Sequence, residues 1–103
     1  MKLVAITSCA TGIAHTFMAA EALERAGKAA GHEMWVETQG AGGYKPLGVD
    51  IISQADAIIF ANDVGIRDKE RFDGCRIVQS TPKEAIKNAK GLIEQAEQLV
   101  SGS

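Results

Sequence analysis

Apolar and polar positions along the chain change period several times, and each change marks a predicted element. Residues 2–8 form a short, mostly apolar run typical of a strand, which leads into a loop at Cys9. From Ala14 apolar residues recur every three or four positions, which predicts a helix of about four turns that stops at Gly31. The expected buried stripe of this helix comprises Ile13, Phe17, Ala20, Leu23 and Gly27. The chain therefore opens as strand, loop and helix.

The middle of the chain predicts two more strands. Residues 33–38 alternate between two unequal faces, as expected for an outer strand. Trp35 on the second face would either pack beneath a helix, which we favour, or belong to a contact surface. Residues 39–48 are rich in glycine, which favours a loop, and residues 50–54 predict a short helix. Residues 55–61 are almost continuously apolar, which indicates an interior strand covered on both faces.

The last third of the chain predicts a fourth strand and a long helix. Polar residues 62–73 indicate a loop or one irregular helical turn, and residues 75–79 a short strand. The final helix has a clear start, because Thr81 can cap it and Pro82 fits its first position. Its expected buried stripe comprises Ile86, Ala89, Ile93, Ala96 and Val100.

Alternation of strands and helices predicts an α/β fold. We expect one domain over residues 1–103, built on an open four-stranded parallel sheet with helices on both faces. In such sheets ligands bind outside the carboxyl ends of the strands, beside the point where the strand order reverses. The first strand normally borders that point, and Cys9 lies at the end of the first strand. We therefore expect a functional residue at Cys9.

Composition excludes several classes of function. A net charge of −2 and a pI near 5.6 leave no basic surplus for nucleic acid. No apolar stretch approaches the roughly 18 residues of a membrane helix, and the amino terminus lacks the pattern of a secretory signal. Cys9 and Cys75 have neither zinc-like spacing nor the density of a disulfide framework. We therefore expect a cytoplasmic domain that does not insert into a membrane.

The loop after the first strand has the composition of a phosphate site. Its backbone N–H groups are expected to converge near the start of the helix, where partial positive charge accumulates. These surroundings favour thiolate over thiol, so the pKa of Cys9 is expected to fall below its ordinary value of about 8.5. One arrangement would both activate the sulfur of Cys9 and hold a phosphate attached to it. The expected phosphate-binding residues are Ala10, Thr11, Gly12, Ile13, Ala14, His15 and Thr16.

Several residues allow two interpretations. Cys9 alone would often be a buried core residue, but its position before a glycine-containing turn and a helix favours a reactive thiol. Cys75 lacks those features and is expected in the core. His15 would either donate to the phosphate or cap and pack. His32 is expected at the surface, and Asp63 would either reach the site or form a turn.

A long segment of the chain resembles a known family. Residues 11–23, with the sequence TGIAHTFMAAEAL, are similar to the B component of the fructose-type phosphoenolpyruvate-dependent sugar phosphotransferase system. Residues 31–33 and 36–40 resemble a second block of that family, and residues 55–56 and 71–72 fit a later part. The resemblance covers essentially the whole chain.

The resemblance implies a phosphoryl carrier. Cys9 would accept a phosphoryl group from a phosphohistidine of the A component and transfer it to a fructose-like sugar bound by the membrane-embedded C component. The domain would lie at the inner face of the membrane through that C component, and no metal, nucleotide or other cofactor is implied. Two positions depart from the family pattern: Ala10 replaces the usual Pro, and Cys75 replaces a residue that is usually not Cys.

Two other functions stay open at this point. A low-molecular-weight phosphatase-like enzyme also places a Cys before a phosphate loop, but with Arg six residues later, where this chain has His15. It would also need an acid, for which Asp63 is a candidate. A redox protein would need a second Cys near Cys9, whereas Cys75 is expected on another strand.

Overall fold

The computed structural model describes residues 1–9, 13–40, 47–66 and 69–101. Strands and helices alternate along them, with one 3-10 turn, η1, before the last strand. The elements in chain order are β1 (Lys2–Cys9), α1 (Ile13–Ala29), β2 (Glu33–Gly40), α2 (Val49–Gln54), β3 (Ala57–Asn62), η1 (Lys69–Phe72), β4 (Ile77–Ser80) and α3 (Pro82–Ser101).

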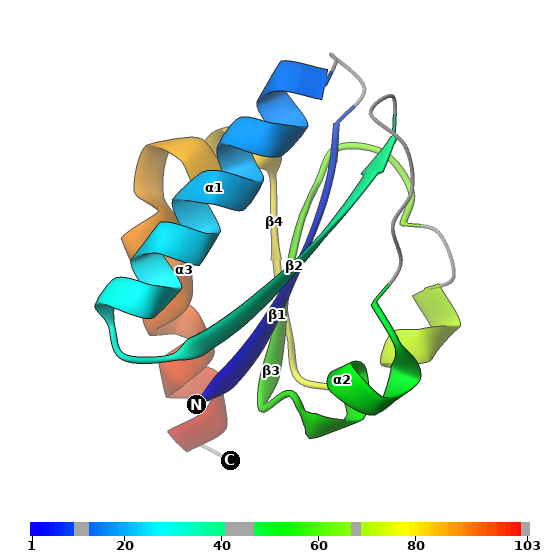
Figure 1. The fold of residues 1–103 in the computed structure, drawn as a ribbon, viewed down its shortest axis with the longest axis vertical. Coiled ribbons are helices and arrows are strands. Elements are labelled where there is room, and N and C mark those ends of the chain that lie inside the picture. Colours follow the sequence, from blue (N-terminus) through cyan, green and yellow to red (C-terminus); the bar gives the residue numbers. More distant parts are fainter. Residues whose placement is uncertain (10–12, 41–46, 67–68, 102–103) are drawn as a thin grey trace.

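The four strands form one parallel sheet in the order β2-β1-β3-β4. The chain moves outward from β1 to the edge strand β2 and then crosses back to β3 on the other side of β1, so the strand order reverses at β1. Helices α1 and α3 cover one face of the sheet, and α2 and η1 cover the other (Figure 1). The predicted fold, including the outer position of β2 and the interior position of β3, is confirmed.

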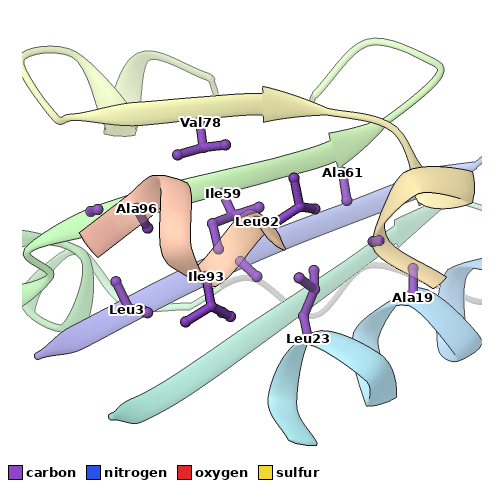
Figure 2. Packing of buried hydrophobic residues seen from close by; sticks show 12 residues of the cluster. Leu3, Ala19, Leu23, Ile59, Ala61, Val78, Leu92, Ile93 and Ala96 are labelled. Carbon is purple, nitrogen blue, oxygen red and sulfur yellow. The ribbon is translucent and has the colours of Figure 1, made fainter. Parts of the chain in front are cut away.

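Each face of the sheet has its own apolar cluster. Alternate residues of β1 point to opposite faces, so Leu3 joins the cluster under α1 and α3, and Val4 joins the cluster under α2 and η1. Figure 2 shows the first cluster, in which Leu23 of α1 and Ile93 of α3 lie against the sheet. Trp35 is half-buried against the second cluster, as predicted.

The buried face of α1 differs from the predicted stripe. Leu23 and Gly27 are buried as predicted, but Phe17 is 49% exposed, and Thr16 and Ala19 are buried in its place. The first half of α1 carries apolar residues on nearly all sides, so the three-to-four-residue spacing fits more than one stripe. The end of α1 follows the prediction, because Gly31 adopts a positive φ of 85° and its N–H donates to the carbonyl of Lys28 at 3.0 Å.

The last strand begins later than predicted, which moves Cys75 out of the sheet. Gly74 has a φ of 82°, and the Cys75 N–H donates to the carbonyl of Phe72 at 3.0 Å, so these residues form a turn after η1. The strand then runs over Ile77–Ser80 rather than over residues 75–79. The Cys75 side chain is half-buried against the second cluster, so its packing role is confirmed but its place in a strand is not.

The prediction that His32 is a surface residue is wrong. Its side chain is only 10% exposed, and its Nε2 lies 2.8 Å from Oε2 of Glu97 on α3. The turn after α1 brings His32 against the far end of the chain, 65 residues away in sequence. Local sequence around His32 carries no sign of that partner.

The start of α3 gives a testable cap. The backbone N–H of Glu84 donates to Oγ1 of Thr81 at 3.2 Å, as the sequence predicts. Thr81→Ala is expected to lower the free energy of unfolding by about 1 kcal/mol, because one N–H at the helix start loses its acceptor. Urea denaturation measures this, with Ser101→Ala at the opposite end of α3 as the control. An unchanged midpoint for Thr81→Ala would show that the cap contributes nothing.

Candidate functional site

Cys9 lies where three strands end side by side. It is the last residue of β1 and pairs in register with Gly40, the last residue of β2. On the other side of β1, Ser8 pairs with Asn62, the last residue of β3. Helix α1 begins at Ile13, at the same edge (Figure 1). The prediction that Cys9 ends the first strand beside the reversal of strand order is confirmed.

The start of α1 provides an electropositive end at this edge. The first N–H groups of a helix have no acceptor within the helix and carry partial positive charge. No acidic residue lies in the first turn of α1 to cancel it. His15 lies in this first turn, and the Thr16 side chain is 3% exposed. The predicted site residues Ala10, Thr11 and Gly12 lie outside the described residues, so the phosphate-binding role of the loop stays a prediction.

Asp63 also lies at this edge. Its backbone N–H donates to the carbonyl of Ser8 at 3.1 Å, which ties the segment after β3 to the end of β1. Just before it, the Asn62 side chain donates to the carbonyl of Val64 at 2.6 Å and accepts from Gln79 at 2.8 Å. The structure thus brings Asp63 beside the end of β1, within a turn that Asn62 closes. A role for Asp63 as an acid stays a prediction.

Sequence reasoning missed a buried ion pair near the site. The Glu37 side chain on β2 is fully buried, and the Arg71 side chain on η1 is 12% exposed. Two parallel hydrogen bonds join them, from Nη1 to Oε1 at 2.9 Å and from Nη2 to Oε2 at 2.8 Å. Glu37 also accepts from the Gln39 side chain and from the backbone N–H of Leu47, at 2.8 Å. Arg71 Nη1 lies 3.3 Å from the Leu47 carbonyl, to which it donates.

This network keeps Glu37 ionised. Burial by itself would raise the pKa of Glu37, but the hydrogen bonds from Arg71, Gln39 and the Leu47 backbone, with the charge of Arg71, outweigh it. The pKa of Glu37 is therefore lowered from its ordinary value of 4.5. The only sequence signal was that Glu37 and Arg71 both fall in blocks shared with the resembling family. Nothing local pairs residues that are 34 positions apart.

The position of Cys75 excludes an internal disulfide with Cys9. Ile77 pairs in register with Ile58, and Ile58 pairs with Val4, so Cys75 lies before the level of Val4 along the sheet. Cys9 is five residues beyond Val4 on β1, which is about 16 Å along the strand. A disulfide needs Cα atoms within about 7 Å. The redox alternative with Cys75 as resolving residue is therefore wrong for this fold.

Within the described ranges, no group of three or more His, Cys, Asp and Glu side chains is placed to hold a metal ion. No helix of those ranges is both long enough and apolar enough to cross a membrane.

Comparisons with known proteins agree with the fold. The sequence model of the family described as "PTS system, Lactose/Cellobiose specific IIB subunit" matches residues 4–95. The "PTS system fructose-specific EIIB component" of Haloferax volcanii is 46% identical over 100 residues. That match covers 96% of this chain, which spans 63% of the length of that relative. The "PTS system fructose-like EIIB component 2" of Escherichia coli K12 is 44% identical over 97 residues, covering 93% of this chain and 92% of the relative.

A solved structure shows the same arrangement. The solution structure of the enzyme IIB subunit of the PTS system from Escherichia coli K12 superposes with a TM-score of 0.90 at 43% identity, covering 98% of this chain and 94% of that one. The family description names lactose and cellobiose, whereas the names of the relatives specify fructose. The fructose-type relatives are 46% and 44% identical over 96% and 93% of this chain. The chain belongs to the IIB components of the sugar phosphotransferase system and, among them, to the fructose-type EIIB family.

Proposed function

We propose that this chain is a phosphoryl carrier in sugar uptake and that Cys9 holds the phosphoryl group. The observation that supports this most directly is the position of Cys9 at the end of β1. There the strand order reverses and the start of α1 follows within a few residues. Ligands of parallel sheets bind at this place, and a helix start favours both a thiolate and a bound phosphate. Cys75 has none of these surroundings.

The proposed reaction has two balanced steps. In the first, the Cys9 thiolate attacks the phosphorus of a phosphohistidine on the A component. The S–P bond forms, the P–N bond breaks, and its electron pair stays on the imidazole nitrogen. In the second, a hydroxyl oxygen of the sugar held by the membrane-embedded C component attacks the same phosphorus. The S–P bond breaks, Cys9 leaves as thiolate, and the hydroxyl proton passes to a base at the sugar site.

The chain contributes binding and electrostatics to both steps. N–H groups at the start of α1 would stabilise the charge on the outer phosphoryl oxygens, and Thr11 and Thr16 would add hydroxyl donors. Gly12 would allow the loop to turn closely around the phosphate, and His15 would donate to it or pack beside it. The names of the relatives support a fructose-like sugar. The chain would act at the cytoplasmic face of the membrane, where it would contact the A and C components.

Mass spectrometry tests this function. The chain is incubated with phosphoenolpyruvate, the general phosphotransfer proteins and a fructose-type A component, and its intact mass is recorded. We expect the mass of one added phosphate, and peptide mapping is expected to locate it on the peptide that contains Cys9. Omission of the A component is the control and is expected to leave the mass unchanged. Absence of the adduct, together with turnover of a free phosphomonoester, would overturn the carrier in favour of a phosphatase.

A further inference from the structure

The Glu37–Arg71 pair joins three segments of the chain. Glu37 belongs to β2, Arg71 belongs to η1, and both bind the backbone of Leu47. Leu47 donates its N–H to Glu37 and accepts with its carbonyl from Arg71, so its peptide groups are held on both sides. Both Glu37 oxygens accept two hydrogen bonds each, which fixes the orientation of the carboxylate.

Of these three segments, β2 runs beside β1 to its end. Glu37 lies three residues before Gly40, the register partner of Cys9. Leu47 lies in the chain between β2 and α2, so the pair joins β2 to the segment that leads into α2. Through Arg71 the same pair joins β2 to η1, which lies between β3 and β4 in the chain. The three segments therefore meet at one carboxylate–guanidinium contact.

The cover on this face of the sheet is made of short elements packed on the second apolar cluster. The opposite face is covered by helices of 17 and 20 residues, whereas α2 has 6 residues and η1 has 4. Phe72 anchors η1 by packing edge-on against Phe60, with ring centroids 5.2 Å apart. Arg71 lies next to it, with Cζ 4.9 Å from the centroid of the Phe72 ring. Because these elements are short, side-chain contacts such as those of Phe72 and Arg71 fix their position.

A buried ion pair adds little net stability but fixes the relative position of the groups that it joins. Desolvation of the two charges offsets most of their attraction, so apolar replacements of similar volume are often as stable. The apolar replacements cannot reproduce four directed hydrogen bonds to one carboxylate. We propose that the Glu37–Arg71 pair is a positioning device that holds Leu47 and η1 against the end of β2 and thereby sets the rate of phosphoryl transfer at Cys9. The inference rests on the carrier function proposed above.

The test separates position from stability. The double variant Glu37→Leu/Arg71→Met removes both charges while keeping volume, and its thermal midpoint is expected to fall far less than that of Arg71→Ala, because no unpaired charge stays buried. Its rate constant for accepting phosphate from the phosphorylated A component is expected to fall about 10- to 100-fold, because displacement by about 1 Å has such effects on transfer. The KM for the A component is expected to change far less. The matched control Glu24→Leu/Lys28→Met removes an exposed pair on α1 and is expected to transfer normally.

Hydrogen exchange of the Leu47 amide reports whether the Glu37–Arg71 pair still holds Leu47 in place. In the double variant this amide is expected to exchange at least about tenfold faster, because its acceptor Glu37 is gone, while amides of β3 keep their protection. If the double variant fails to fold, the same measurements are made on Arg71→Lys. Lys keeps the positive charge but cannot form two parallel hydrogen bonds to one carboxylate.

The outcomes are distinguishable. No phosphate on the wild type overturns the carrier function and the inference with it. Phosphate on the wild type and an equal rate constant in a folded Glu37 or Arg71 variant overturn the inference alone. A lower rate constant with unchanged exchange of the Leu47 amide also overturns the inference, because the pair would then affect transfer without holding Leu47 in position.

Discussion

Cys9→Ser is expected to lose all phosphoryl labelling in the mass experiment described above. A serine hydroxyl stays protonated at the start of α1, whereas a thiol in that position ionises readily, so the nucleophile is lost although the shape is kept. Cys75→Ser is the matched control and is expected to label like the wild type, because Cys75 lies in the turn before β4, far from the end of β1.

Alkylation of the same proteins measures the thiol directly. The rate of Cys9 modification is expected to rise with pH around a midpoint below about 8.5, since the thiolate is the reacting form. A phosphate adduct on Cys9→Ser would contradict the assignment of Cys9, and loss of labelling in Cys75→Ser alone would transfer the role to Cys75.

Arg71→Ala is expected to lower the free energy of unfolding by about 3–5 kcal/mol at neutral pH. The substitution leaves Glu37 fully buried without the guanidinium that satisfies both of its oxygens. Urea denaturation measures the loss. Arg25→Ala breaks an exposed pair with Glu21 on α1 and serves as the control, with an expected cost of less than about 1 kcal/mol. Equal costs at the two positions would contradict the importance of burial.

The pH dependence of the Arg71→Ala deficit has a definite sign. In the wild type the folded pKa of Glu37 is lowered, so its contribution to stability is fully present above the ordinary value of 4.5 and is lost as the pH falls through the lower folded value. In the variant, burial without Arg71 would raise the folded pKa, so the folded state binds more protons than the unfolded state. The deficit is therefore expected to shrink between neutral pH and about pH 4.5. A deficit that grows over this range would contradict the argument.

The elements that sequence predicted well are those whose signals are local. Gly31 ends α1 through its own positive φ, and Thr81 starts α3 through a hydrogen bond to a residue three positions away. The apolar run of β3 is buried on both faces, as continuous hydrophobicity predicts. The boundary of β4 was missed by two residues, because Gly74 makes a turn that places Cys75 outside the strand.

The sequence by itself determined the order of strands and helices and placed Cys9 at the end of β1, because periodicity, caps and glycine turns act over a few residues. Only the tertiary structure decided which side of α1 is buried, leaving Phe17 exposed. It also decided that Glu37 pairs with Arg71 and that His32 meets Glu97. A charged or titratable side chain is buried only where the fold brings it a partner, and these partners are 34 and 65 residues away. No local pattern contains that information.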